Sequence, residues 1–62
     1  MPHNRFYSLG PLIPGEIVLL HEAEARHMKV MRLKKGEMVE LIDGQGNLAT
    51  GTVIDHDQIL LD

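Results

Sequence analysis

Lysines and arginines gather in one short stretch of the 62-residue chain, and this clustering is the first feature that could do chemistry. Five of the six lie within ten positions, with no acid between them: Arg26, Lys29, Arg32, Lys34 and Lys35. The net charge is −3, but a phosphate group meets the local field rather than the net charge, so such a cluster can bind nucleic acid. The alternative is a solvated helix face, which is the commoner meaning of such charges.

A helix is predicted over positions 21–31, and it would carry part of this cluster. The stretch contains no glycine or proline, is rich in good helix formers, and places Glu22 and Glu24 in its first turn. Glu22 also precedes Arg26 by four residues, a spacing that favours an ion pair. At about 100° per residue, the inward arc is predicted to hold Leu20, Ala23, His27, Val30 and Met31, with Arg26, Lys29 and Arg32 on the opposite side.

Histidines, acids and a serine elsewhere suggest further sites, and each fails on spacing or context. His21 and His27 are six residues apart, whereas a helical zinc pair needs a spacing of four. The Asp-Gly-Gln-Gly stretch at 43–46 lacks the order of a phosphate-binding loop and a helix after it. The Asp-His-Asp stretch at 55–57 lacks a pocket, and Ser8 lacks an activating base. The sequence therefore predicts no metal site, no bound cofactor and no catalysis by this chain itself.

The composition predicts a small core of modest stability. There is no cysteine, so disulfides and thiolate zinc sites are excluded, and Phe6 and Tyr7 are the two aromatic residues. Domains below roughly 70–80 residues usually need a staple or a partner surface. The chain also stops on the apolar run 58–61. We therefore expect a domain truncated at its C-terminus, to which the natural protein adds more chain or a second subunit.

The N-terminal sequence and the hydropathy of the chain indicate its cellular location. No apolar stretch typical of a signal peptide opens the sequence, and no run approaches the roughly 18 apolar residues of a membrane span. The lack of cysteine fits a reducing compartment. The expected location is cytoplasmic.

The segments on either side of the cationic cluster are predicted to form short strands joined by tight turns. Strands are predicted at 5–9, 16–20, 38–42, 48–54 and 58–61, with the helix between the second and third. Asp-Gly at 43–44 predicts a hairpin, and Gly36 is expected to stop the helix or to form the following turn. The order β-β-α-β-β-β predicts a mainly β fold, a small barrel with one short helix plugging it.

The order of these motifs resembles one known family. The chain opens with Arg-Phe-Tyr at 5–7, continues with Gly-Glu-Ile-Val-Leu at 15–19 and the helix-to-turn stretch 24–37, and ends its hairpin with Val-Glu-Leu-Ile-Asp-Gly-Gln-Gly at 39–46. Together they resemble the N-terminal domain of the ribosomal RNA small subunit methyltransferase E family. Two positions depart from the family pattern: Arg26 stands where a second histidine is common, and Met31 where leucine is common.

The resemblance implies a PUA-like RNA-binding barrel over residues 1–62, joined in the parent to a knotted SPOUT domain that binds S-adenosylmethionine. It implies methylation of N3 of a uridine in 16S ribosomal RNA by a homodimer, with the catalytic and cofactor residues outside this chain. With the charge pattern, it gives these candidate RNA-binding residues: Arg5, Arg26, His27, Lys29, Arg32, Lys34 and Lys35. Two alternatives stay open. The barrel could instead pack on its own catalytic domain or a second subunit without touching RNA, and Arg32 could be structural, pairing with an acid such as Asp43.

Overall fold

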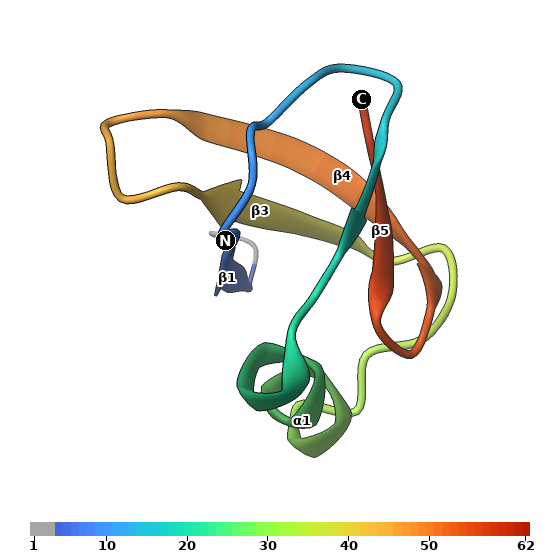
Figure 1. Ribbon diagram of the computed structural model, residues 1–62. Helices are drawn as coiled ribbons and strands as arrows, with labels where there is room; N and C mark the ends of the chain where they lie inside the picture. The colour runs from blue at the N-terminus through green and yellow to red at the C-terminus, as the bar shows by residue number, and fades with distance from the viewer. Residues whose placement is uncertain (1–3) are drawn as a thin grey trace.

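Five short strands form one curled sheet in the computed structural model, which describes residues 4–62. The strands are β1 (Arg5–Tyr7), β2 (Ile17–Leu19), β3 (Met38–Ile42), β4 (Leu48–Asp55) and β5 (Gln58–Leu61). Their spatial order is β1-β3-β4-β5-β2, with β1 parallel to β3 and the other pairs antiparallel. The sheet curls as a half-barrel, and the helix α1 (Glu22–Val30) lies at one end of it (Figure 1). The predicted mainly β barrel with one helix is confirmed.

The hairpin between β3 and β4 is organised by one carboxylate. Asp43 Oδ1 accepts hydrogen bonds from the backbone N–H groups of Gln45 (2.7 Å) and Asn47 (3.2 Å), and its Oδ2 accepts one from Asn47 Nδ2 (2.7 Å). Gly44 and Gly46 both have positive φ, which glycine adopts without steric cost. The side chain of Asn47, followed by the backbone of Gln45, lowers the pKa of Asp43. The three hydrogen bonds that this carboxylate accepts therefore all lie within its own turn.

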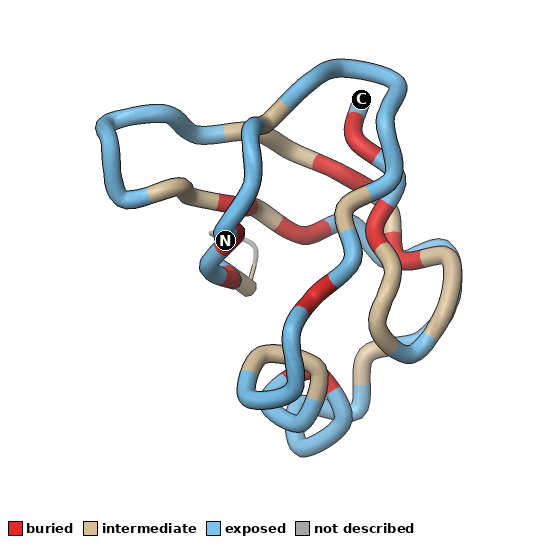
Figure 2. The backbone as a smooth tube through the Cα atoms, in the orientation of Figure 1, coloured by how far each residue is buried: buried red, intermediate tan, exposed pale blue. Residues whose placement is uncertain are grey.

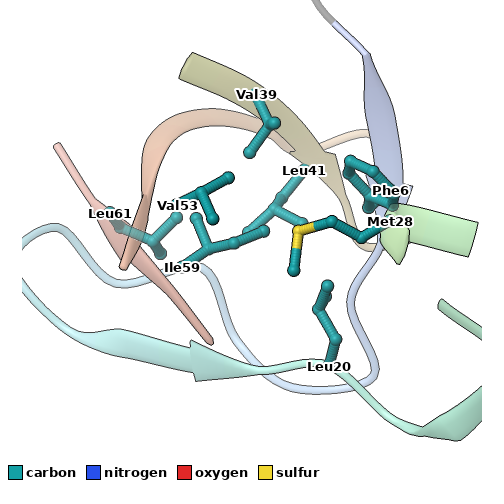
Figure 3. Close-up of a cluster of buried hydrophobic side chains, with 8 residues drawn as sticks. All are labelled: Phe6, Leu20, Met28, Val39, Leu41, Val53, Ile59 and Leu61. Atoms are coloured by element: carbon teal, nitrogen blue, oxygen red, sulfur yellow. The ribbon is translucent and has the colours of Figure 1, made fainter. Parts of the chain in front are cut away.

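Within residues 4–62, the core consists of eight buried apolar side chains inside the curl of the sheet. Alternate residues point inward, as on β3, where Val39 and Leu41 are buried and their neighbours are not. The full set is Phe6, Leu20, Met28, Val39, Leu41, Val53, Ile59 and Leu61. Phe6 of β1 and Met28 of α1 lie beside each other in this cluster, so the helix packs against the inner face of the sheet near β1 (Figure 3). Burying one such side chain contributes about 1.5–3 kcal/mol, so this cluster dominates the stability of the domain.

The inward face of the helix differs from the predicted one. Met28 is the buried helical residue and Ala25 packs partly against the core, whereas Val30 is 72% exposed and Met31 is 44% exposed. His27 and Ala23 are exposed as well. The predicted arc was right for Leu20, which is buried, but wrong for the four residues of the arc after it, because the helix turns Met28 and Ala25 toward the core instead. The helix has nine residues, and its attachment through Leu20 and Met28 sets which face is buried.

Candidate nucleic-acid interface

The helix ends in a paired hydrogen-bond motif that places Arg32 in an unusual backbone conformation. The N–H of Arg32 donates to the carbonyl of Lys29 (3.0 Å), and the N–H of Leu33 donates to the carbonyl of Met28 (3.4 Å). These bonds define a Schellman motif, with Arg32 in the left-handed region at φ 58°. Leu33 packs against the core cluster that contains Met28, which is the apolar contact that accompanies this motif. Gly36 is therefore not the helix stop, because Arg32 takes that position.

The next four residues form a tight turn that carries two lysines. The N–H of Glu37 donates to the carbonyl of Lys34 (3.1 Å), and Gly36 supplies the positive φ of 93°. The carboxylate of Glu37 accepts a hydrogen bond from the N–H of Lys34 at 2.7 Å. Val53 of β4 bonds the turn twice, accepting from the N–H of Gly36 (2.8 Å) and donating to the carbonyl of Glu37 (2.9 Å). The backbone beneath both lysines is thus fixed to the sheet, although their side chains are exposed.

Ion pairs divide the candidate cations into two groups. Arg5 on β1 donates to Glu40 Oε1 from both Nε (3.3 Å) and Nη2 (3.1 Å), and Arg26 donates to Glu22 Oε1 at 3.2 Å. The predicted Glu22–Arg26 pair is therefore confirmed. Four others make no side-chain hydrogen bond or ion pair within residues 4–62. We call them the open cation group: Lys29, Arg32, Lys34 and Lys35. They lie along the helix end and the turn after it, where most of the chain is exposed (Figure 2).

His27 belongs to the packing around the helix rather than to the open cation group. Its ring lies 5.1 Å from the ring of Phe6, at an interplanar angle of 59°, and its Nδ1 is 3.6 Å from Glu24 Oε2. That carboxylate oxygen is buried and has no hydrogen-bond partner within the described chain. His27 thus covers the edge of the core while half its side chain stays exposed.

No second site emerges from the rest of residues 4–62. His56 lies between two carboxylates, with Nδ1 3.1 Å from Asp55 Oδ1 and Nε2 3.6 Å from Asp57 Oδ2, on an exposed turn. Hydrogen bonds from the backbone and then the ring of His56 lower the pKa of Asp55. A hollow of about 810 Å³ lies between the β1–β2 connection and the ends of β4 and β5. Across the described chain, no group of three or more metal-binding side chains forms, and no helix is long and apolar enough to cross a membrane.

Comparisons with protein families and with solved structures identify the family to which this chain belongs. Residues 20–62 match the family of RNA methyltransferase PUA domains, and the chain belongs to that family. Among solved structures, it is similar to a ribosomal RNA small subunit methyltransferase E from Neisseria gonorrhoeae bound to S-adenosyl methionine. The identity is 30% over 95% of this chain, with a TM-score of 0.78. The resemblance drawn from the sequence motifs is therefore confirmed.

A second solved structure supports the fold alone. It is a Legionella pneumophila protein in complex with the cofactor SAM, at 23% identity over 98% of this chain, with a TM-score of 0.83. The chain spans 26% of the length of each of these two structures. No curated protein sequence gives a significant match.

Proposed function

We propose that this chain is the RNA-binding domain of an S-adenosylmethionine-dependent methyltransferase that acts on ribosomal RNA. The open cation group is the observation that carries this proposal. Lys29, Arg32, Lys34 and Lys35 stand close in sequence on a backbone held by hydrogen bonds, and their charged groups form no ion pair within residues 4–62. Family membership and the similarity to a ribosomal RNA methyltransferase support the same role.

The finer parts of the proposal follow from the family resemblance. The parent would methylate N3 of a uridine in 16S ribosomal RNA, work as a cytoplasmic homodimer, and bind the methyl donor in a SPOUT domain. In this arrangement residues 1–62 form the RNA-binding unit, and the methyl donor and the reacting atoms lie in the other domain. The chain matches about a quarter of its solved relatives, which supports a division of labour between two domains.

The chemistry of the surface indicates how RNA would be held. Phe6 is buried, and Tyr7 lies on β1, away from the open cation group in the sequence. In the sequence, the half-exposed ring of His27 is the aromatic ring nearest to these cations, and one ring offers little of the stacking on which sequence-specific RNA recognition usually depends. Cations that contact phosphates fix position without reading bases. The domain would thus position ribosomal RNA, and the choice of nucleotide would be made elsewhere in the parent.

Titration of a 16S ribosomal RNA fragment with the 62-residue chain at several salt concentrations tests the proposal. With about three phosphate contacts, log affinity should fall with log salt at a slope of about −2 to −3. Binding that does not depend on salt, or no binding at millimolar protein, would contradict it.

A second function is supported by a different surface. Ile17 and Leu19 on β2 are 56% and 67% exposed. In the strand register, Ile17 lies opposite Leu60 of β5. Leu60 lies opposite Thr52 of β4, and Thr52 lies opposite Met38 of β3. Met38 and Leu60 are exposed too, so these side chains share the outer face of the sheet. Such a face suits packing on the parent's catalytic domain. Leu19→Lys in the parent should then speed proteolytic release of this domain, while the 62-residue chain keeps its melting temperature and its RNA affinity.

A further inference from the structure

Arg32 occupies a backbone position that favours glycine. Five residues within 4–62 have positive φ, and the other four are all glycines: Gly15, Gly36, Gly44 and Gly46. In a Schellman motif the left-handed position is also usually glycine, because a Cβ there is sterically unfavourable. The chain therefore uses glycine at every other described position that needs this conformation, and an arginine at this one.

No hydrogen bond or ion pair of the arginine side chain within the described chain offsets this backbone cost. Arg32 is exposed and makes no ion pair or side-chain hydrogen bond with residues 4–62. Asp43, the structural partner considered from the sequence, is engaged by Gln45 and Asn47 instead. Val30 and Met31, which the sequence placed on the inward arc of the helix, are both exposed and do not hold Arg32. What does hold the residue is the backbone motif and Leu33, which packs on the core.

The neighbours of Arg32 show why this position suits a phosphate. Its N–H is hydrogen bonded to Lys29, the next residue is anchored to Met28, and the turn that carries Lys34 is bonded to β4. The exposed side chain of Arg32 thus starts from a fixed backbone position, with Lys29 and Lys34 near it in the sequence. A guanidinium can donate two parallel hydrogen bonds to one phosphate, which an ammonium cannot match. Because the backbone of Arg32 is already fixed, less conformational entropy is lost when its side chain binds a phosphate.

We propose that Arg32 is the phosphate-gripping residue of this domain, retained at a glycine position because its contact with an RNA phosphate outweighs the backbone strain. This inference rests on the proposed RNA binding. It adds the residue that contacts the phosphate and an exchange of folding stability for RNA affinity at that residue. Removing the arginine in favour of glycine should make the domain more stable and a worse RNA binder. A residue kept for the fold would behave in the opposite way.

Arg32→Gly is the decisive variant, with Lys35→Ala as its matched control and Arg32→Lys as the conservative change. We expect Arg32→Gly to raise the melting temperature by several degrees. It should also weaken binding to the 16S ribosomal RNA fragment about fivefold or more and reduce the salt slope by about 1. Arg32→Lys should keep the melting temperature and the slope but still weaken binding more than twofold, because the fork is lost. Lys35→Ala should leave the melting temperature unchanged.

A parallel titration of the unmodified chain distinguishes failure of the proposed RNA binding from failure of the proposed role of Arg32. If it shows no salt-dependent RNA binding, the proposed function itself is wrong, and this inference falls with it. If it binds as expected but Arg32→Gly binds within twofold of it, the role of Arg32 is overturned while RNA binding stands. A lower melting temperature for Arg32→Gly would overturn the trade-off and show that the arginine supports the fold.

Discussion

Two groups of cations on this domain differ in what surrounds them rather than in their own chemistry. Arg5 and Arg26 each donate to a carboxylate, Glu40 and Glu22, whereas Lys29 and its neighbours in the open cation group have no such partner within residues 4–62. The paired cations lie on regular elements, where side chains at set spacings meet. Lys29 lies in the last turn of α1, and the other three open cations follow it at the helix end and in the turn. The carboxylate of Glu37 in that turn accepts the backbone N–H of Lys34 instead of pairing with a cationic side chain, so the charges of this group stay available for a ligand.

The largest effect on stability should come from Met28, the buried residue that anchors the helix end carrying the open cation group. Met28 is buried in the core, and its carbonyl accepts the N–H that closes the helix end. We expect Met28→Ala to destabilise the domain by about 2–5 kcal/mol and to loosen the backbone that carries the open cation group. Val30→Ala is the matched control on the same helix: it is 72% exposed and should change stability by less than about 0.5 kcal/mol. Thermal and urea unfolding measure both, and equal losses would show that the helix face is assigned wrongly.

The next effect concerns Asp43, which distinguishes a structural role for Arg32 from a binding one. Its folded pKa is lowered, so its hydrogen bonds stabilise the hairpin above the ordinary carboxyl pKa of 3.8, and this stability is lost as pH falls through the folded value. The melting temperature of Asp43→Asn should therefore lie below that of the unmodified chain at pH 6, and the gap should close below about pH 3.8.

Arg32→Ala serves as the test of pairing in the same pH series. Because the hydrogen bonds of Asp43 come from Gln45 and Asn47, adding Asp43→Asn to the Arg32→Ala variant should lower the melting temperature as much as it does in the unmodified chain. A decrease that disappears in the Arg32→Ala background would mean that the two side chains are paired.

The smallest effect should come from releasing the paired cations. Glu22→Gln removes the partner of Arg26, an exposed pair worth only a few tenths of a kcal/mol, so the melting temperature should stay within about 1–2 °C. The freed arginine should strengthen RNA binding by up to about twofold. Glu16→Gln, which removes an equal charge from a residue outside the ion pairs of the described chain, is the control. An equal gain in both variants would show that overall charge, not pairing, sets the affinity.

Much of the fold was predictable because local rules and burial agree along the strands. The bounds of β3 and β5 match the predicted ones, and the Asp-Gly turn gives the hairpin its expected place. The helix face was not predictable from periodicity. Val30 and Met31 are apolar but stay exposed, because the helix packs on the core through Met28 and Ala25 instead.

The candidate site was predictable as a cluster, but not as two groups. The spacing of Glu22 and Arg26 predicted one ion pair, whereas the partner of Arg5 lies 35 residues away on a neighbouring strand and depends on the register of β1 and β3. The left-handed conformation of Arg32 had no signal in its residue type, since glycine is the usual marker of such a position. A useful sign, in hindsight, is the apolar Leu33 directly after the arginine, because this motif buries the residue that follows the left-handed one.

A comparison of two double variants tests most directly whether the open cation group binds RNA. Lys34→Ala with Lys35→Ala and Arg5→Ala with Arg26→Ala each remove two positive charges, so any effect of net charge is the same in both. Titrations of the 16S ribosomal RNA fragment at several salt concentrations should show the lysine variant binding roughly tenfold more weakly, with a slope reduced by about 1 to 2. The arginine variant should stay within about threefold of the unmodified chain and keep its slope. Equal losses in the two variants would contradict the account, because binding would then follow overall charge rather than the cations that the fold leaves open.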